Sequence, residues 1–144
     1  MMCRAWSCLL GLVCGALVGC VTPDRAVVTD VEVDGWACGA SLCYANDDEQ
    51  SLRTMTLFVR VDDRFLEDTL TVRIETRTPD SLRTTEWHRM RFQGEPTPAS
   101  LHRVIRVPYR RSVRFAERGN YHFRITPTRT VVGVEAVGLQ ISNE

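Results

Sequence analysis

The stretch Gly119-Asn-Tyr-His-Phe-Arg-Ile-Thr126 decides the fold of this chain. Its large apolar residues, Tyr121, Phe123 and Ile125, alternate one by one with polar residues. A period of two is typical of a β-strand that buries one of its faces. We therefore expect a strand here, with Phe123 in the core.

The same period recurs along the chain between short turn signals. Residues 55–61 and 70–75 alternate most cleanly, although Phe58 interrupts the polar side of the first of these segments. Further extended segments are expected at 26–33, 83–92, 101–107, 113–115 and 132–141, with Pro108 ending the segment before it. Repeated short strands without a helix are typical of sandwiches and barrels. The sequence thus predicts an all-β chain, a single antiparallel, jelly-roll-like β-sandwich of about eight strands over residues 26–144.

The N-terminal segment resembles a bacterial lipoprotein signal. Arg4 gives a positive start, residues 5–19 carry no charge, and the run ends in Leu17-Val18-Gly19-Cys20. Fifteen residues reach only about 22 Å as a helix, short of a ~30 Å hydrocarbon core, although a short uncleaved anchor is the alternative. By this resemblance, residues 1–19 are a signal peptide, Cys20 carries the lipid, and residues 20–25 form a tether. Val at position 21 rather than Asp favours the outer membrane, with the domain facing the periplasm.

Two cysteines remain in the expected mature chain besides Cys20, namely Cys38 and Cys43. An even pair in an oxidising compartment is expected to form a disulfide. A metal site is the alternative, but two thiols without a histidine nearby make a poor zinc site. We therefore predict a Cys38–Cys43 disulfide and no bound metal or cofactor.

Charge is balanced overall but uneven along the chain. All 18 basic residues are arginines and they match 18 acidic ones. Acidic residues dominate residues 21–76, whereas arginines dominate residues 77–144. Acidic and basic strands could offset each other, or a basic face could serve phosphate or an acidic partner. The densest basic stretch contains Arg110, Arg111 and Arg114, which we identify as candidate partner-binding residues; a solvated sheet edge is the alternative.

The C-terminal third resembles a known family. Its pattern runs Val113-x-Phe115, Gly119-x-Tyr121-x-Phe123-x-Ile125, then Val132-Gly133-Val134 and Val137-Gly138-Leu139-x-Ile141. This pattern, over roughly residues 104–142, is similar to the end of the GldH family, gliding-motility-associated lipoproteins of Bacteroidota. The resemblance implies an association with the gliding machinery and the type IX secretion apparatus. It implies no catalytic residues.

Catalytic signatures such as Gly-x-Ser-x-Gly, a phosphate loop or His-Glu-x-x-His do not occur in the sequence. We therefore expect a non-enzymatic protein, tethered to a membrane through Cys20, that scaffolds envelope protein partners and binds no nucleic acid. A ligand-binding module of the same fold, for glycans, is the alternative. A scaffold needs a contiguous apolar or charged patch, whereas a glycan module needs a groove with exposed aromatic residues.

Overall fold

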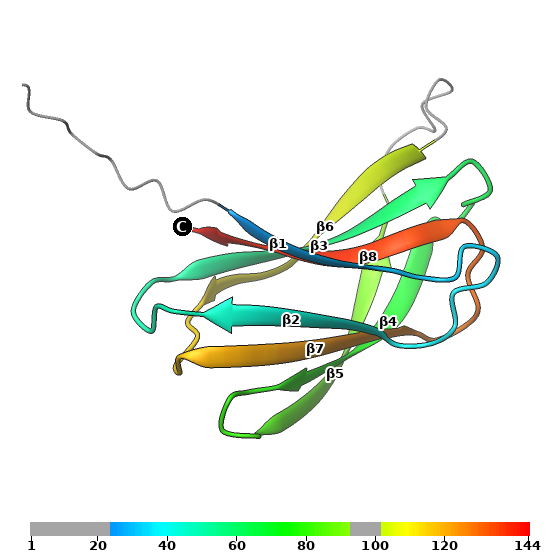
Figure 1. Ribbon diagram of the computed structural model, residues 1–144. Helices are drawn as coiled ribbons and strands as arrows, with labels where there is room; N and C mark the ends of the chain where they lie inside the picture. The colour runs from blue at the N-terminus through cyan, green and yellow to red at the C-terminus, as the bar shows by residue number, and fades with distance from the viewer. Residues whose placement is uncertain (1–23, 93–101) are drawn as a thin grey trace, which may run out of the picture.

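Eight antiparallel strands in two sheets make up the domain (Figure 1). The computed structural model describes residues 24–92 and 102–144. The strands are β1 (Arg25–Asp30), β2 (Ala40–Asn46), β3 (Arg53–Asp62), β4 (Thr69–Arg77), β5 (Arg83–Arg91), β6 (His102–Val113), β7 (Gly119–Pro127) and β8 (Val134–Asn143). One sheet has the order β1-β8-β3-β6, and the other has the order β2-β7-β4-β5. No helix in these two ranges is long and apolar enough to span a membrane.

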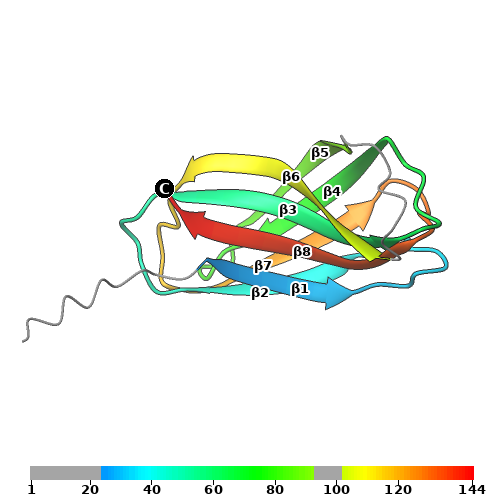
Figure 2. The ribbon, with the colours of Figure 1, turned by 90° about the horizontal axis from the view of Figure 1, so that it is seen from above.

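Strand order confirms the predicted sandwich. The chain changes sheet at every connection except the β4–β5 hairpin, so that β1 lies opposite β2 at one side of the sandwich and β6 lies opposite β5 at the other. This is the arrangement of a jelly roll. Figure 2 shows the layers from above, with β1, β8, β3 and β6 in front of the second sheet.

Side-chain alternation builds the core between the sheets. Phe123 is 3% exposed and Tyr121 is 6% exposed, which confirms the inward face predicted for that strand. Buried residues also alternate along β4, which neighbours β7, and along β3 of the facing sheet, whereas β8 of that sheet is buried continuously from Ala136 to Leu139. The largest fully buried side chains are Trp36, Tyr44, Leu57, Leu70, Ile74, Met90, Ile125, Leu139 and Ile141.

Two strand predictions were wrong. Residues 40–46 form β2, where no strand was expected, and its buried residues include Leu42 and Tyr44. Strand β6 continues through Pro108 to Val113, where two separate segments were expected. Pro108 lies opposite Thr56 on the edge strand of its sheet, and an edge strand tolerates a missing N–H because one side has no ladder partner.

The interruption at Phe58 has a packing reason. Phe58 lies opposite Gly138 on the outer face of the β1-β8-β3-β6 sheet. A Cβ atom on Gly138 would lie 2.1 Å from Cζ of the phenyl ring, so the ring lies directly over the glycine. The glycine thus gives an outward-facing phenylalanine a half-buried place.

Both chain ends of the described domain lie at one end of the sandwich. β1 starts there, and the C-terminus follows β8 at the same end (Figures 1 and 2). The antiparallel order places the β2–β3, β4–β5 and β6–β7 connections at this end too. We call it the tether end, because the expected lipid-bearing segment precedes it.

Candidate functional site: an arginine-rich sheet face

Arginines gather on the outer face of the β2-β7-β4-β5 sheet. The alternation that buries Val72 and Ile74 in β4 directs Arg73 and Arg77 outward. Strand β5 buries Met90 and exposes its arginines in the same way. This outer face, here called the arginine face, carries Arg73, Arg77, Arg83, Arg89, Arg91 and Arg124.

Strand register turns these residues into rows across the sheet. Arg83 lies directly opposite Arg77, and Arg77 lies opposite His122 of β7. In the next row Glu75 lies between Thr85 and Arg124. Two arginines and a histidine are therefore consecutive cross-strand neighbours.

Acidic side chains do not balance the positive charge of this face. Glu75 is the one acidic residue among its outward positions in the four described strands. It pairs with Arg73 at 3.5 Å. The other five arginines make no ion pair with any residue in the described ranges. Like charges directly opposite each other destabilise a sheet, so the Arg77–Arg83 pair is not explained by stability of the fold.

A hollow of about 410 Å³ opens on the arginine face. Its lining comes from β2, β7, β4 and β5 and includes nothing from the facing sheet, so it lies on the outer surface. Arg77, Arg83, Arg124 and His122 surround it, together with Glu75 and the hydroxyl-bearing Ser41 and Thr85. This lining suits an anion, because guanidinium groups present forked donors to phosphate and carboxylate oxygens.

Glycine helps to place one of these arginines. A Cβ atom on Gly39 would lie 2.2 Å from Nε of Arg124. The Arg124 side chain therefore lies directly over the backbone of Gly39, just before β2. A side chain at position 39 would force the Arg124 side chain to move.

An exposed aromatic residue adjoins the hollow. Trp87 lies in the row next to Thr85, opposite Arg73, and is 64% exposed. Trp36, in contrast, is 1% exposed and donates its indole N–H to the carbonyl of Cys38 at 2.8 Å. The exposed indole offers an apolar ring face on which a ligand can stack.

The three arginines selected from the sequence have different surroundings. Arg110 of β6 pairs with Glu86 of β5 at 2.5 Å and lies 5.6 Å from the centre of the Tyr109 ring. Glu86 also accepts a hydrogen bond from the Tyr109 hydroxyl. Arg110 therefore links the two sheets at their open side, where the edge strands β5 and β6 lie opposite each other. Arg111 and Arg114, in contrast, are exposed and make no ion pair within the described ranges.

Beside this ion pair, His88 closes the same side of the sandwich. Its ring packs edge-on against Tyr109, with 5.2 Å between ring centres. Burial lowers the pKa of His88 below its ordinary value, because a charged imidazolium loses its hydration there. The neutral ring therefore fits this place between β5 and β6.

The expected disulfide is not formed. Cys38 and Cys43 are both free and exposed. The burial of Leu42 and Tyr44 directs Cys43 to the outer face.

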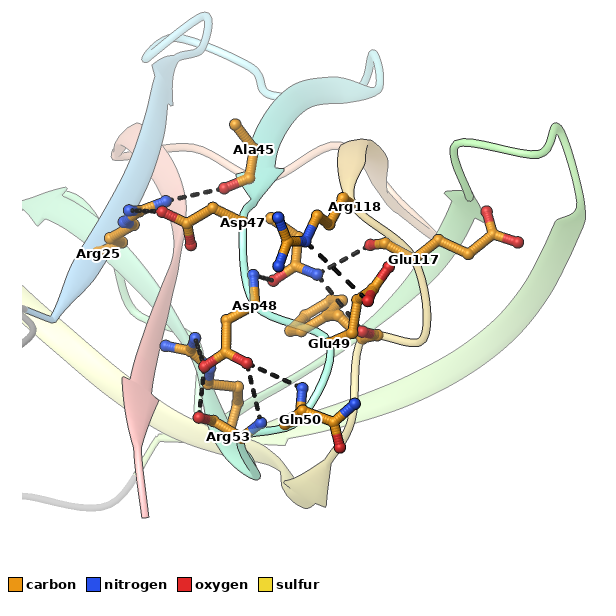
Figure 3. A network of polar contacts seen from close by, with 12 residues as sticks. Arg25, Ala45, Asp47, Asp48, Glu49, Gln50, Arg53, Glu117 and Arg118 are labelled. Atoms are coloured by element: carbon orange, nitrogen blue, oxygen red, sulfur yellow. Dashed lines mark hydrogen bonds and ion pairs between the residues drawn. The ribbon is translucent and has the colours of Figure 1, made fainter.

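A polar network holds the tether end together (Figure 3). Arg25, the first residue of β1, donates to the carbonyl of Ala45 at 2.9 Å and pairs with Asp47 at 2.8 Å. Asp48 accepts hydrogen bonds from the Ser51 hydroxyl and from nearby backbone amides, which lower its pKa to about 2. The start of β1 is thus fixed to the neighbouring sheet. The predicted lipidation site, Cys20, lies outside the described residues.

Sequence reasoning did not select the arginine face. Its signal was available in part, because Arg83, Arg89 and Arg91 share one strand parity with Trp87. What the sequence lacked was the register that sets Arg124 and His122 beside these strands. No protein-family model matches the chain, and no curated protein is significantly similar to it in sequence. Within residues 24–92 and 102–144, no cluster of three or more histidine, cysteine or acidic residues could hold a metal ion.

Proposed function

We propose that this chain is a non-enzymatic, lipid-anchored protein of the bacterial envelope that docks an acidic partner on its arginine face. In this proposal it serves as an accessory or scaffold component of the gliding motility and type IX secretion machinery. The lipoprotein signal and the GldH-like C-terminal pattern support the cellular setting. The arginine face supports the docking role.

One observation carries the proposal, namely six arginines against one glutamate on one sheet face. From Arg83 to Arg91 the face extends eight residues along β5, or about 27 Å. A single-sign surface of this length attracts oppositely charged partners and raises their association rate. The partner must therefore present phosphates or carboxylates.

The other sheet offers a different surface. On its outer face Arg60 is paired with both Asp30 and Glu135. Acidic side chains thus offset basic ones on this face, which has no excess comparable to six arginines against one glutamate. A docking role consequently belongs to the β2-β7-β4-β5 sheet.

The experiment is recovery of partners with the full lipidated chain from envelope membranes, followed by mass spectrometry. A variant with Arg77, Arg83, Arg89 and Arg91 all changed to Gln should lose its partners while keeping its circular dichroism spectrum. Recovery by the wild type should also decline as salt rises, because exposed charges are screened over about 8 Å at physiological salt.

A matched control changes four arginines of β6 and the loop after it, namely Arg103, Arg106, Arg111 and Arg114, to Gln. These residues also lack ion pairs within the described ranges, so the charge change is the same. Equal recovery by the two quadruple variants would show that net charge, rather than the arginine face, holds the partner. Unchanged recovery by both variants would refute docking by charge.

A second candidate function is a saccharide-binding module. The exposed Trp87 beside the hollow favours it, because sugar-binding surfaces combine aromatic faces with a few polar groups. The two functions share the arginine face and differ in what occupies it.

A further inference from the structure

We propose that the hollow on the arginine face binds the phosphate group of a phosphorylated saccharide, with the sugar ring on Trp87. This inference rests on the docking role of the arginine face and names the chemistry of its ligand. The exposed Trp87 indicates a saccharide as the ligand. The positive charges around the hollow indicate that this saccharide carries a phosphate.

The first step is the unfavourable row of charges. Arg83, Arg77 and His122 are consecutive cross-strand neighbours, and neither arginine has an acidic partner among the residues described. An arrangement that costs stability in the free protein is relieved when an anion lies between the charges. Departures from local stability rules of this kind are expected at functional sites.

The second step is the charge of the ligand. Arg77, Arg83 and Arg124 bring three positive charges to the hollow, and Glu75 brings one negative charge that Arg73 already neutralises. A phosphate monoester carries about −1.5 to −2 charges at pH 7 and has three acceptor oxygens. A single carboxylate would leave more of the positive charge uncompensated. The hollow therefore favours a phosphate over a carboxylate.

The third step is the position of the tryptophan. Thr85 lines the hollow, and Trp87 is two residues further along the same outer face of β5, about 7 Å away. Arg83 lies a further ~7 Å before Thr85, so a sugar ring over the indole would hold its phosphate near Thr85, within reach of the long arginine side chains. The hydroxyl of Thr85, on the β5 side of the hollow, is available to a sugar hydroxyl.

Isothermal titration calorimetry on the full chain, purified from membranes in detergent, tests the assignment. The probes are glucose 6-phosphate, inorganic phosphate, glucose and glucuronate, in a buffer free of phosphate. We expect glucose 6-phosphate to bind at least tenfold more tightly than glucose or glucuronate, and severalfold more tightly than inorganic phosphate.

Two matched double variants locate the site. Arg77→Gln with Arg83→Gln should weaken glucose 6-phosphate binding at least tenfold. Arg103→Gln with Arg106→Gln removes the same charge from β6 of the other sheet, away from the arginine face, and should change binding less than threefold. Trp87→Ala should weaken binding of the sugar phosphate severalfold and leave that of inorganic phosphate unchanged.

Each outcome is decisive. Equal losses in the two double variants would overturn the hollow in favour of diffuse attraction. Equal affinity for inorganic phosphate and glucose 6-phosphate, without an effect of Trp87→Ala, would overturn the saccharide. Glucuronate binding as tightly as the sugar phosphate would overturn the preference for phosphate. If no probe binds the wild type while the quadruple face variant still loses its envelope partners, only this inference fails and the docking function remains.

Discussion

Replacing Arg83 by glutamate should stabilise the protein, although the residue belongs to the proposed site. Arg83 and Arg77 face each other across the β4–β5 pair. Directly opposite side chains have Cβ atoms about 4.5–5.5 Å apart, and a charged pair changes stability by about 0.2–1 kcal/mol in the direction set by its signs. The substitution removes one repulsive pair and creates one attractive pair. We therefore expect the free energy of unfolding to rise by about 0.5–1.5 kcal/mol.

Thermal unfolding followed by circular dichroism measures this gain. For a domain of this size, about 1 kcal/mol corresponds to roughly 3–5 °C in Tm, so Tm should rise by about 1.5–7.5 °C. The gain should shrink at high salt, because both residues are exposed. Arg91→Glu is the control, since Arg91 lies opposite Thr69 and faces no arginine across the pair. Its Tm should change by less than that of Arg83→Glu.

The same variant should bind glucose 6-phosphate at least tenfold more weakly. If the repulsion between the two arginines is retained for ligand binding, a variant that removes it should be more stable and bind the ligand more weakly. An unchanged or lower Tm for Arg83→Glu at low salt would refute the reasoning, because the two side chains could not then be close enough to repel each other.

Three further predictions concern the core, the thiols and the open side of the sandwich. Phe123→Ala should lower the free energy of unfolding by about 3–5 kcal/mol in urea titrations, since the ring is buried between the sheets; a loss below 1 kcal/mol would contradict that position. Cys38 and Cys43 should both be alkylated in the folded, unreduced protein, whereas labelling only after reduction would restore the disulfide. The free energy of unfolding should fall as pH drops below about 6.5, because the pKa of His88 is lower in the folded protein and the unfolded chain therefore takes up the proton first. His88→Gln should flatten this dependence between pH 7 and 5. An unchanged slope would assign the dependence to other groups.

Alternation made the central strands predictable from the sequence. In β7 and β4 every large apolar residue shares one parity, so the face that each strand buries could be read directly. In β2 the signal was weak, because its seven residues hold only Leu42 and Tyr44 as large apolar side chains among small ones. The two cysteines suggested a covalent loop, whereas the structure leaves both thiols free.

The strand end predicted at Pro108 was wrong for a different reason. Pro108 was read as the end of a strand because it cannot donate a ladder hydrogen bond. Whether that matters depends on the place of the strand in its sheet, and β6 is an edge strand only because β3 pairs with β8 on its other side. Sheet order is a property of the whole fold, and no window of the sequence around Pro108 contains it.

The arginine face could not be predicted from the sequence for the same physical reason. Parity within β5 could show that Arg83 and Trp87 share a side, but the basic row also needs Arg77 from β4 and His122 from β7. These residues come together only through the order β2-β7-β4-β5, in which β7 follows β4 by more than 40 positions in sequence. The sequence instead pointed to Arg110, whose charge the structure neutralises with Glu86.

Sheet order also relates the anchor to the proposed ligand. β1 begins at the tether end, and the Arg77–Arg83 row lies at that same end, because it flanks the β4–β5 hairpin. Arg91 lies about 27 Å away, at the far end of β5. If the lipid on Cys20 fixes the tether end to the membrane, the hollow lies nearest the bilayer and the arginine face extends away from it. A phosphorylated saccharide that emerges from the membrane surface would then meet the phosphate site first and Trp87 next, in the order in which β5 presents them.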